Sequence, residues 1–388
     1  MTHWHIITGE YPPQPGGVSD YTRRIARGLV AAGDRVDVWA PPGDGPECID
    51  AGVTVRRLPD RFGPRGLRML SRELDLEPAP RRLLVQYVPH AFGWKAANLP
   101  FCLWLQSRRR DSIWVMFHEV AFPFDRDQAV SRNALAVVNR LMASIVASSA
   151  ERAFVSIPGW LPMVAPMIGE GKPIEWLPVP SSIPVVRDPA ASAAVRARYA
   201  ETRPLAGHFS TYGTVIREML DASIPPLVEA SDCQVLLLGR GSDESARALI
   251  ATHPGLTDRL HATGVLTDEA VSQHIAACDV MVQPYPDGVS TRRTSAMVGL
   301  SHGVPIVTTS GWLTEPLWEE SGALELVPAD DPQRLAVAAA RLLASPALRE
   351  ELGSRGRELY LSRFDMQHSI RRLREADVAS RQLTAVDA

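Results

Sequence analysis

QPYPDGVSTRRTSAMVGLSHGVPIVT, residues 283–308, contains a strand end, a loop, a helix and a second strand in close succession. A hydrophobic strand at 279–282 leads into a loop at 284–290, a helix is predicted at 291–301, and the second strand follows at 305–308. This succession places a helix N-terminus and unpaired backbone N–H groups at the carboxyl edge of a parallel sheet, where phosphates and other anions bind. The segment therefore predicts an α/β domain with an anion site.

Two adjacent arginines, Arg292 and Arg293, are predicted in the first turn of this helix. Positive charge is unfavourable at a helix N-terminus, so their position indicates a strong anion nearby. The alternative is that both are solvated surface side chains. Residues 283–308 alone do not decide between these two interpretations.

Length and composition bound the class of protein. The chain has 388 residues, and at about 150 residues per domain this length predicts two or three domains. Hydrophobic residues make up 45% and charged residues 22%, which is typical of a soluble globular protein. The net charge of -3 does not favour nucleic-acid binding.

The cysteine pattern and the N-terminal residues favour a cytoplasmic protein. The four cysteines are scattered without CxxC spacing, which argues against a disulfide framework or a structural zinc site. The first residues, MTHWHIITGEY, read as a strand and lack the features of a signal peptide. No run approaches the ~18 apolar residues of a membrane span. We therefore expect a reducing compartment and no transmembrane anchor.

Strands and helices alternate in the first half of the chain, and two strand ends carry candidate site residues. A strand at 4–8 runs into a loop that ends in Gly16 and Gly17, where the backbone can approach a ligand closely. The loop is not the GxGxxG dinucleotide fingerprint, and a plain turn is the alternative. A later strand, 112–117, delivers His118 to the edge where open α/β sheets bind ligands. A structural histidine is the alternative for His118.

The same alternation restarts after a proline-rich segment at 174–184, which reads as a linker. Strands and glycine loops reappear from residue 206 onward. We therefore predict an α/β protein with two doubly wound, Rossmann-like domains, 1–185 and 186–365, and a cleft between them.

Two arginine-rich segments, residues 56–82 and 108–110, lie in the first half. The simpler interpretation is a set of solvated surface side chains. The alternative is a basic patch that contacts an acidic membrane surface or an anionic acceptor.

The order and spacing of several segments resemble the retaining, GT-B-fold glycosyltransferases of glycosyltransferase family 4 and, more distantly, trehalose-phosphate synthases. The resembling segments extend over nearly the whole chain: Glu10–Gly17 with Tyr21, Phe117-His118, Val235–Gly241, Asp287–Ser290 with Ser295–Met297, Gly303–Val307, and Arg357–Phe364. The resemblance implies an N-terminal acceptor-binding domain and a C-terminal domain that binds a nucleotide-diphosphate sugar. It also implies that the last helix, within 366–388, packs back onto the first domain.

Carried onto this sequence, the resemblance implies two catalytic residues. His118 would lie beside the anomeric carbon of the donor, and Asp287 would accept hydrogen bonds from donor-sugar hydroxyls. The diphosphate would be approached by the backbone of five further residues: Gly16, Gly17, Gly288, Val289 and Ser290.

Two positions depart from the family's pattern. Ser295 stands where the family has a second glutamate that binds ribose hydroxyls, and one hydroxyl cannot replace the paired acceptance of a carboxylate. Thr211 stands near the family's arginine, and Arg217 near its lysine. We expect Arg217 and Arg292 together to neutralise the leaving diphosphate, because arginine binds phosphate through two N–H groups.

The predicted function is a retaining, hexosyltransferase-type glycosyltransferase that moves a sugar from a nucleotide-diphosphate sugar to a hydroxyl of a glycan, lipid or small molecule. No metal-binding DxD motif follows a suitable strand, so we expect no metal requirement and no other cofactor. Two alternatives remain open. One is a sugar-nucleotide epimerase of the same fold, and the other is a catalytically inactive protein that binds nucleotide sugars.

Overall fold

The computed structural model describes residues 1–43 and 48–386, with side chains described as far as Val378. The chain forms two compact units. The N-terminal unit comprises Met1–Val179 together with Met366–Ala388, and the C-terminal unit comprises Pro180–Asp365. The division between the units therefore falls at 179/180, slightly before the expected boundary at 185/186, and the last helix belongs to the N-terminal unit.

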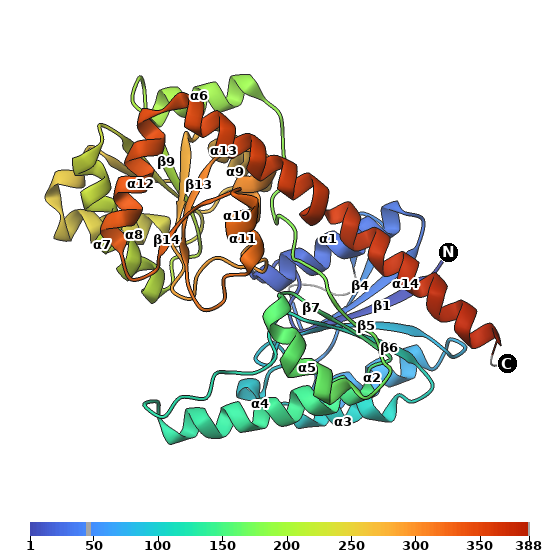
Figure 1. Ribbon diagram of the computed structural model, residues 1–388. Helices are drawn as coiled ribbons and strands as arrows, with labels where there is room; N and C mark the ends of the chain where they lie inside the picture. The colour runs from blue at the N-terminus through green and yellow to red at the C-terminus, as the bar shows by residue number, and fades with distance from the viewer. Residues whose placement is uncertain (44–47, 387–388) are drawn as a thin grey trace. The chain divides into compact units, whose positions relative to one another are not determined.

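A central sheet organises the N-terminal unit, with the strand order β3-β4-β2-β1-β5-β6-β7-β8 (Figure 1). All neighbouring strands are parallel except β3 and β4. The strands are β1 (His3–Thr8), β2 (Arg35–Ala40), β3 (Cys48–Asp50), β4 (Val53–Arg57), β5 (Arg82–Tyr87), β6 (Ser112–Phe117), β7 (Arg152–Val155) and β8 (Ile174–Trp176). The central strands are continuous apolar runs because helices cover both faces of the sheet.

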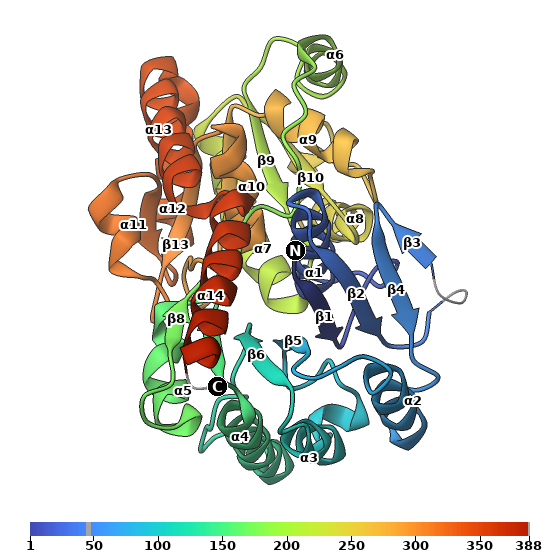
Figure 2. The same cartoon turned by 90° about the vertical axis from the view of Figure 1, so that its right-hand side faces the viewer.

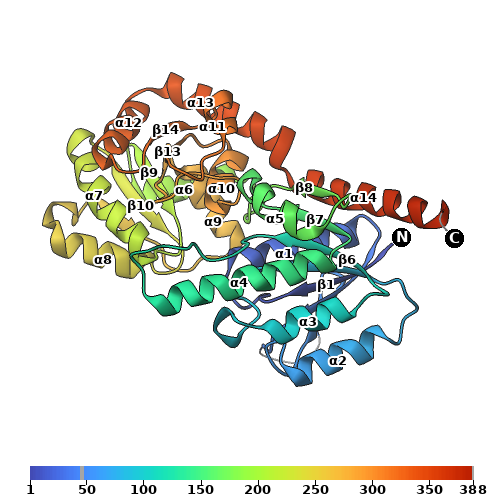
Figure 3. The ribbon, with the colours of Figure 1, turned by 60° about the horizontal axis from the view of Figure 1, so that its bottom comes forward.

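Two separate hydrophobic clusters lie on the two faces of this sheet. One packs against α2 (Pro64–Leu74), α3 (Leu99–Ser107), α4 (Val130–Ser149) and α5 (Leu161–Ile168) (Figure 3). The other packs against α1 (Gly17–Ala31) and α14 (Met366–Val386). Two short 3-10 helices, η1 (Trp94–Ala96) and η2 (Pro158–Trp160), complete the unit.

The C-terminal unit contains a second parallel sheet, with the order β11-β10-β9-β12-β13-β14 (Figure 2). Its strands are β9 (Leu205–Phe209), β10 (Gln234–Leu238), β11 (Leu260–Ala262), β12 (Val280–Gln283), β13 (Ile306–Ser310) and β14 (Glu325–Pro328). Its helices are α6 (Pro189–Tyr199), α7 (Thr214–Ala230), α8 (Ser242–Thr252), η3 (Pro254–Leu256), α9 (Asp268–Ala277), α10 (Thr294–His302), α11 (Pro316–Ser321), α12 (Pro332–Ala344), α13 (Pro346–Leu359) and the π-helical turn η4 (Tyr360–Phe364).

The structure confirms the predicted α/β class with two doubly wound parallel sheets. The interpretation of 174–184 as a linker is wrong at its start, because residues Ile174–Trp176 form β8 and pair with β7 at the edge of the first sheet. The prolines that suggested a linker begin only at Pro178, after the strand, where no ladder hydrogen bond is lost. No helix in the described part of the chain is both long and apolar enough to cross a membrane.

Helix α14 is held in the N-terminal unit by close packing and by buried charge. Gly28 of α1 faces Ile370, and a Cβ at Gly28 would lie 2.7 Å from the Ile370 Cδ1 atom. The Arg82 Nε and Nη2 atoms lie 3.0 and 2.9 Å from Asp377 Oδ1, and both side chains are buried. Thr2 Oγ1 donates to Asp377 Oδ2 at 2.7 Å.

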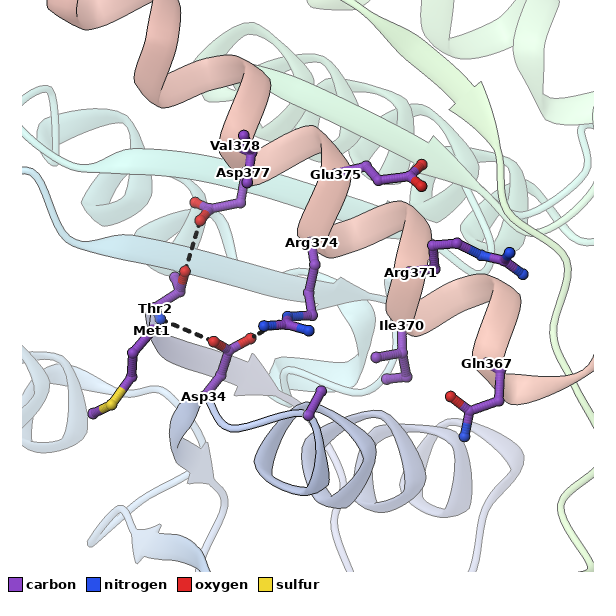
Figure 4. Close-up of a pocket in the computed structure, with 11 residues that line it drawn as sticks. Met1, Thr2, Asp34, Gln367, Ile370, Arg371, Arg374, Glu375, Asp377 and Val378 are labelled. Carbon is purple, nitrogen blue, oxygen red and sulfur yellow. Dashed lines mark hydrogen bonds and ion pairs between the residues drawn. The ribbon is translucent and has the colours of Figure 1, made fainter.

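A cavity of about 650 Å³ lies beside these contacts, between α14 and the N-terminal residues (Figure 4). Asp34 closes one side, where its Oδ2 accepts from Arg374 Nε at 3.1 Å and its Oδ1 accepts from the Thr2 amide at 2.9 Å. Hydrogen bonds and an ion pair that connect Thr2 and Asp34 with α14 therefore line the cavity.

Replacing Asp377 with alanine is expected to destabilise the N-terminal unit by ~3 kcal/mol, because it leaves the buried Arg82 guanidinium without its closest carboxylate. Urea denaturation followed by tryptophan fluorescence measures the change. Glu375→Ala is the matched control, since Glu375 is exposed on the same helix and pairs with Arg372 only at 3.8 Å. That control should change stability by less than ~0.5 kcal/mol. Equal effects of the two substitutions would show that the Arg82–Asp377 pair does not anchor α14.

Candidate functional site

The loop that follows β12 is tightly fixed to the end of β13 and to the segment that follows this strand. The Tyr285 amide donates to Thr309 Oγ1 at 2.7 Å, and Thr309 Oγ1 donates to the Tyr285 carbonyl at 2.6 Å. Gly288 has φ +84°, and a Cβ there would lie 2.2 Å from Thr314 Oγ1 and 2.3 Å from the Gly311 nitrogen. Only glycine fits this position, for both backbone and steric reasons.

Three amides of this loop are used within the unit. The Gly288 N–H donates to the Tyr285 carbonyl at 3.1 Å, and the Val289 N–H donates to the Thr309 carbonyl at 2.8 Å. The Thr291 N–H donates to Glu315 Oε1 at 2.9 Å. The expectation that the amides of Gly288 and Val289 face a phosphate does not agree with these bonds, because each amide has one proton to donate.

Ser290 and Gln283 offer polar groups that have no partner among the described residues. The Ser290 Oγ is fully buried and makes no hydrogen bond, and the same holds for both side-chain polar atoms of Gln283 at the end of β12. Buried polar atoms of this kind are rare, since each loses its bonds to water. A ligand or a water molecule would satisfy them.

Asp287 lies between two guanidinium groups from the turn that follows. Arg292 Nη2 lies 2.9 Å from Asp287 Oδ2, and Arg293 Nη2 bonds to Asp287 Oδ1. The Arg293 guanidinium also lies 4.7 Å from the centre of the Tyr285 ring. All three charged side chains are partly buried.

The predicted place of the two arginines is wrong by one turn. Helix α10 begins at Thr294, so Arg292 and Arg293 precede it. Asp287 compensates one of their two positive charges and explains why both guanidinium groups lie in this turn. Sequence spacing did not show this pairing because the turn at Gly288 folds the loop back on itself.

Ser295 lies in the first turn of α10, and its Oγ is 2.8 Å from the Tyr285 hydroxyl. Burial raises the pKa of Tyr285 to about 12, so this hydroxyl keeps its proton at neutral pH. Either oxygen can be the donor of this hydrogen bond. Ser295, which stands where the family has a glutamate, therefore fixes the position of the Tyr285 ring through this hydrogen bond.

Glu315 is a buried residue of this site that the sequence analysis missed. Its carboxylate accepts from the Thr291 amide, from Thr291 Oγ1 at 2.7 Å and from Trp318 Nε1 at 2.7 Å. It fixes the backbone next to Ser290. The sequence Glu315-Pro316 signals a helix start, but it does not show that the carboxylate turns inward.

Arg217 lies in the first turn of α7, near the carboxyl edge of β9. Its Nε donates to the Tyr212 carbonyl at 2.8 Å. Its two terminal nitrogens lie 3.3 and 3.2 Å from the two carboxylate oxygens of Glu244. Because this ion pair is well exposed, it contributes little stability and is easily exchanged for another anion.

His118 lies at the carboxyl end of β6 and is buried in the N-terminal unit. Its Nε2 is 2.8 Å from Gln86 Oε1, and its ring packs edge-on against Tyr21 with 4.8 Å between the ring centres. Its carbonyl accepts from Ser156 Oγ at 3.0 Å. Burial lowers the pKa of His118 to about 3, so the imidazole is neutral at physiological pH.

The glycine pair lies at the start of α1, where Gly17 precedes Tyr21 by four residues. A Cβ on Gly16 would lie 2.5 Å from Glu10 Oε1, whereas a Cβ on Gly17 would meet nothing within 4 Å. The same Glu10 oxygen accepts from the Ser19 amide at 3.1 Å, and burial raises the pKa of Glu10. A carboxyl group therefore already lies at this helix N-terminus, and Gly16 is small because of it.

Each unit thus brings together part of the predicted site. In the C-terminal unit, the β12–α10 segment gathers six predicted residues: Asp287, Gly288, Val289, Ser290, Arg292 and Ser295. In the N-terminal unit, α1 connects the glycine pair with His118 through Tyr21. One group of described residues could hold a metal ion, His3, His5 and Asp37, and it lies at the opposite edge of the first sheet from His118.

Comparisons with known proteins agree with this architecture. The family described as "Glycosyl transferase 4-like domain" matches residues 16–160, and the family described as "Glycosyl transferases group 1" matches residues 206–345. The two matches lie in different units and together span most of the chain. The comparison with curated protein sequences gives no match.

Solved structures resemble the chain along its full length at low identity. Sucrose-phosphate synthase from Thermosynechococcus elongatus has 18% identity and a TM-score of 0.77, with 100% of each chain covered. Anabaena HepE in complex with UDP-glucose has 16% identity and a TM-score of 0.68, covering 98% of this chain and 100% of the other. The trehalose 6-phosphate synthase from Burkholderia multivorans has 13% identity and a TM-score of 0.63, with 100% of each chain covered.

The two family matches lie on two parallel-sheet α/β units, and the similar structures share that arrangement. The chain is therefore a glycosyltransferase with the GT-B fold, built from a 4-like domain and a group 1 domain, and it resembles glycosyltransferase family 4.

Proposed function

We propose that this glycosyltransferase moves a sugar from a nucleotide-diphosphate sugar to a hydroxyl acceptor and keeps the anomeric configuration. The observation that carries the proposal is the Asp287 carboxylate, held between Arg292 and Arg293 at the carboxyl edge of β12. This arrangement offers a carboxylate for sugar hydroxyls and a guanidinium for phosphate within one loop. A further support is that HepE, which is similar in fold, was solved with UDP-glucose.

Donor binding would proceed by exchange of ion-pair partners. The diphosphate attracts the Arg292 guanidinium, which leaves Asp287 Oδ2 able to accept from a sugar hydroxyl. Arg293 keeps its contact with Asp287 during this exchange, so the carboxylate remains paired when Arg292 moves to the diphosphate. Arg217 gives up Glu244 in the same way. Ser290 Oγ and the two Gln283 side-chain atoms remain as unpaired groups that can bind the donor.

The transfer step itself would depend on stabilisation of charge. An oxocarbenium-like transition state is expected for glycosyl transfer, and charge grows on the departing phosphate. Arg292 and Arg217 stabilise that charge, and the departing phosphate accepts the acceptor's proton. His118, which is neutral, positions the sugar through hydrogen bonding and supplies no proton. We propose that the reaction requires no metal and no other cofactor.

The N-terminal unit would bind the acceptor, in a cytoplasmic protein. All four cysteines are free thiols, which suits a reducing compartment. A peripheral membrane contact through residues 56–82 and 108–110 has less support. Arg81 and Arg108 from these segments are both paired with Asp111 inside the unit, at 2.5 and 2.7 Å.

Asp287→Asn is expected to abolish the extra stabilisation that a sugar nucleotide provides over the free nucleotide diphosphate, because the amide has one acceptor oxygen and no charge where the carboxylate has two acceptor oxygens and a negative charge. A thermal-shift panel of UDP, GDP, ADP and dTDP with their glucose forms measures this. A ligand at ~100 times its dissociation constant adds about 2.7 kcal/mol. Arg292→Gln should weaken the binding of all the nucleotide diphosphates, with and without the sugar.

Arg247→Ala is the control for surface charge, since Arg247 is exposed on α8 of the same unit. Proton NMR of the sugar released to water identifies the anomer formed first, and retention is expected. Inversion contradicts the proposed stereochemistry. An isomerised donor would favour an epimerase, and binding without turnover would favour an inactive binding protein.

The parent protein is expected to lose stability as the pH falls, and His118→Gln is expected to make this loss smaller. The pKa of His118 is lowered to about 3 by burial, whereas an exposed histidine has a pKa of about 6.5. As the pH falls below about 6.5, the histidine binds a proton in the unfolded chain but stays neutral in the native state. Native stability is therefore intact above that pH and falls at up to ~1.4 kcal/mol per pH unit below it.

Urea denaturation of both proteins at several pH values from 7.5 down to 5 tests this, and the stability of the variant should approach that of the parent as the pH falls. Val265→Ala, which shortens an exposed side chain with no titratable group, should leave the pH dependence unchanged. A difference between parent and His118→Gln that stays constant with pH would contradict the assigned neutral state.

A further inference from the structure

We propose that His3, His5 and Asp37 form a binding site for a divalent transition-metal ion such as Zn²⁺, at the start of β1 and β2. One ligand atom from each residue lies within 4.8 Å of the other two. The site lies at the amino ends of the strands, opposite the edge that carries His118. It is separate from the transfer chemistry, and the proposal does not depend on the donor.

The strand geometry brings these residues together. Residues i and i+2 of a strand point to one face, so His3 and His5 project on the same side of β1. The parallel register pairs His5 with Asp37 of β2. His5 and Asp37 are each 2% exposed, whereas His3 is partly exposed.

Each ring nitrogen of His3 lies close to a carboxylate oxygen, but a neutral imidazole has only one proton to donate. Its Nδ1 lies 2.7 Å from Glu77 Oε2, and its Nε2 lies 3.1 Å from Asp37 Oδ2. A neutral imidazole has one N–H, and ionised carboxylates only accept. If Nδ1 donates to Glu77, the Nε2 lone pair faces a carboxylate oxygen. A second proton on the ring or a metal ion between the two atoms resolves that contact.

The same geometry suits a metal site. Two donors on a tetrahedral zinc ion with bonds of ~2.0–2.1 Å lie about 3.3 Å apart, close to the separation of His3 Nε2 and Asp37 Oδ2. A histidine ligand whose other nitrogen donates to a carboxylate is the usual arrangement around protein-bound metals, and Glu77 supplies that carboxylate. Two imidazoles and a carboxylate favour Zn²⁺, Co²⁺ or Ni²⁺ over Mg²⁺ or Ca²⁺.

Two buried atoms in the cluster have no hydrogen-bond partner within the described residues. They are His5 Nε2 and Asp37 Oδ1. A cavity of about 560 Å³ lined by His3, His5 and Glu77 gives an ion access from solvent.

The surrounding charges permit a divalent ion. Arg35 and Arg56 lie 3.7 and 3.8 Å from Asp37 Oδ2, while Glu77 adds a second carboxylate near Arg35. Metal ligation through His5 Nε2 moves the ring proton to Nδ1. That change gives up the contact from Trp39 Nε1 to His5 Nδ1 and the contact between His5 Nε2 and Glu77 Oε2, which at 3.4 Å are both long for hydrogen bonds.

The test uses the full-length protein, stripped of metal with a chelator, and Zn²⁺ or Co²⁺ as the probe. Calorimetric titration is expected to show one Zn²⁺ per chain, and Co²⁺ should give the visible absorption bands of a tetrahedral site. His3→Gln and Asp37→Asn should abolish both signals. Glu77→Gln should weaken binding by about 10- to 100-fold, because Glu77 orients His3 without binding the ion.

His253→Ala is the matched control, since His253 is an exposed histidine paired with Asp221 in the C-terminal unit, and it should leave binding unchanged. Circular dichroism of each variant separates loss of metal from loss of fold, and His3→Gln is the safest variant because His3 is partly exposed. Binding that survives His3→Gln and Asp37→Asn, or no binding at all in the parent, would overturn the proposal.

Discussion

Each of the two sheets is parallel, apart from the β3–β4 pair at one edge, and has helices packed on both faces, so the polar chemistry of each unit is confined to the two ends of its strands. His118 follows β6 directly, and Asp287 follows β12 within a few residues. The cluster of His3, His5 and Asp37 lies at the other end, where β1 and β2 begin. The same burial that makes the strands apolar therefore decides where side chains with chemical function can lie.

The ion pairs of the molecule divide by burial into two kinds. The Arg82–Asp377 pair is buried, so removing one partner leaves a desolvated charge, and the pair anchors α14. The Arg217–Glu244 pair is exposed, so a competing anion can replace Glu244 at little cost in free energy. The Asp287–Arg292 pair is less exposed than that pair but more exposed than Arg82–Asp377, and Arg293 remains on Asp287 if Arg292 leaves. This difference in exposure is the physical reason to regard the first pair as structural and the other two as available for a ligand.

Glycine positions show how closely backbone segments approach one another at the site. Gly288 lies against Gly311 and Thr314, so the loop carrying Asp287 cannot move independently of the segment after β13. Glu315 ties that same segment to Thr291. The loop is consequently rigid where Asp287 is presented.

The order of elements, the α/β class and the strand-end positions of His118 and Asp287 follow from local signals, since apolar runs and glycine turns are properties of neighbouring residues. Three features do not follow from local signals: the pairing of Asp287 with Arg292 and Arg293, the inward carboxylate of Glu315, and the meeting of His3 with Asp37. The first depends on the path of a turn, the second on packing around Trp318, and the third on the register of two strands. Local patterns specify which segments form strands and helices, whereas contacts between residues distant in the chain arise only when those segments pack, because burial and charge compensation are properties of the assembled fold.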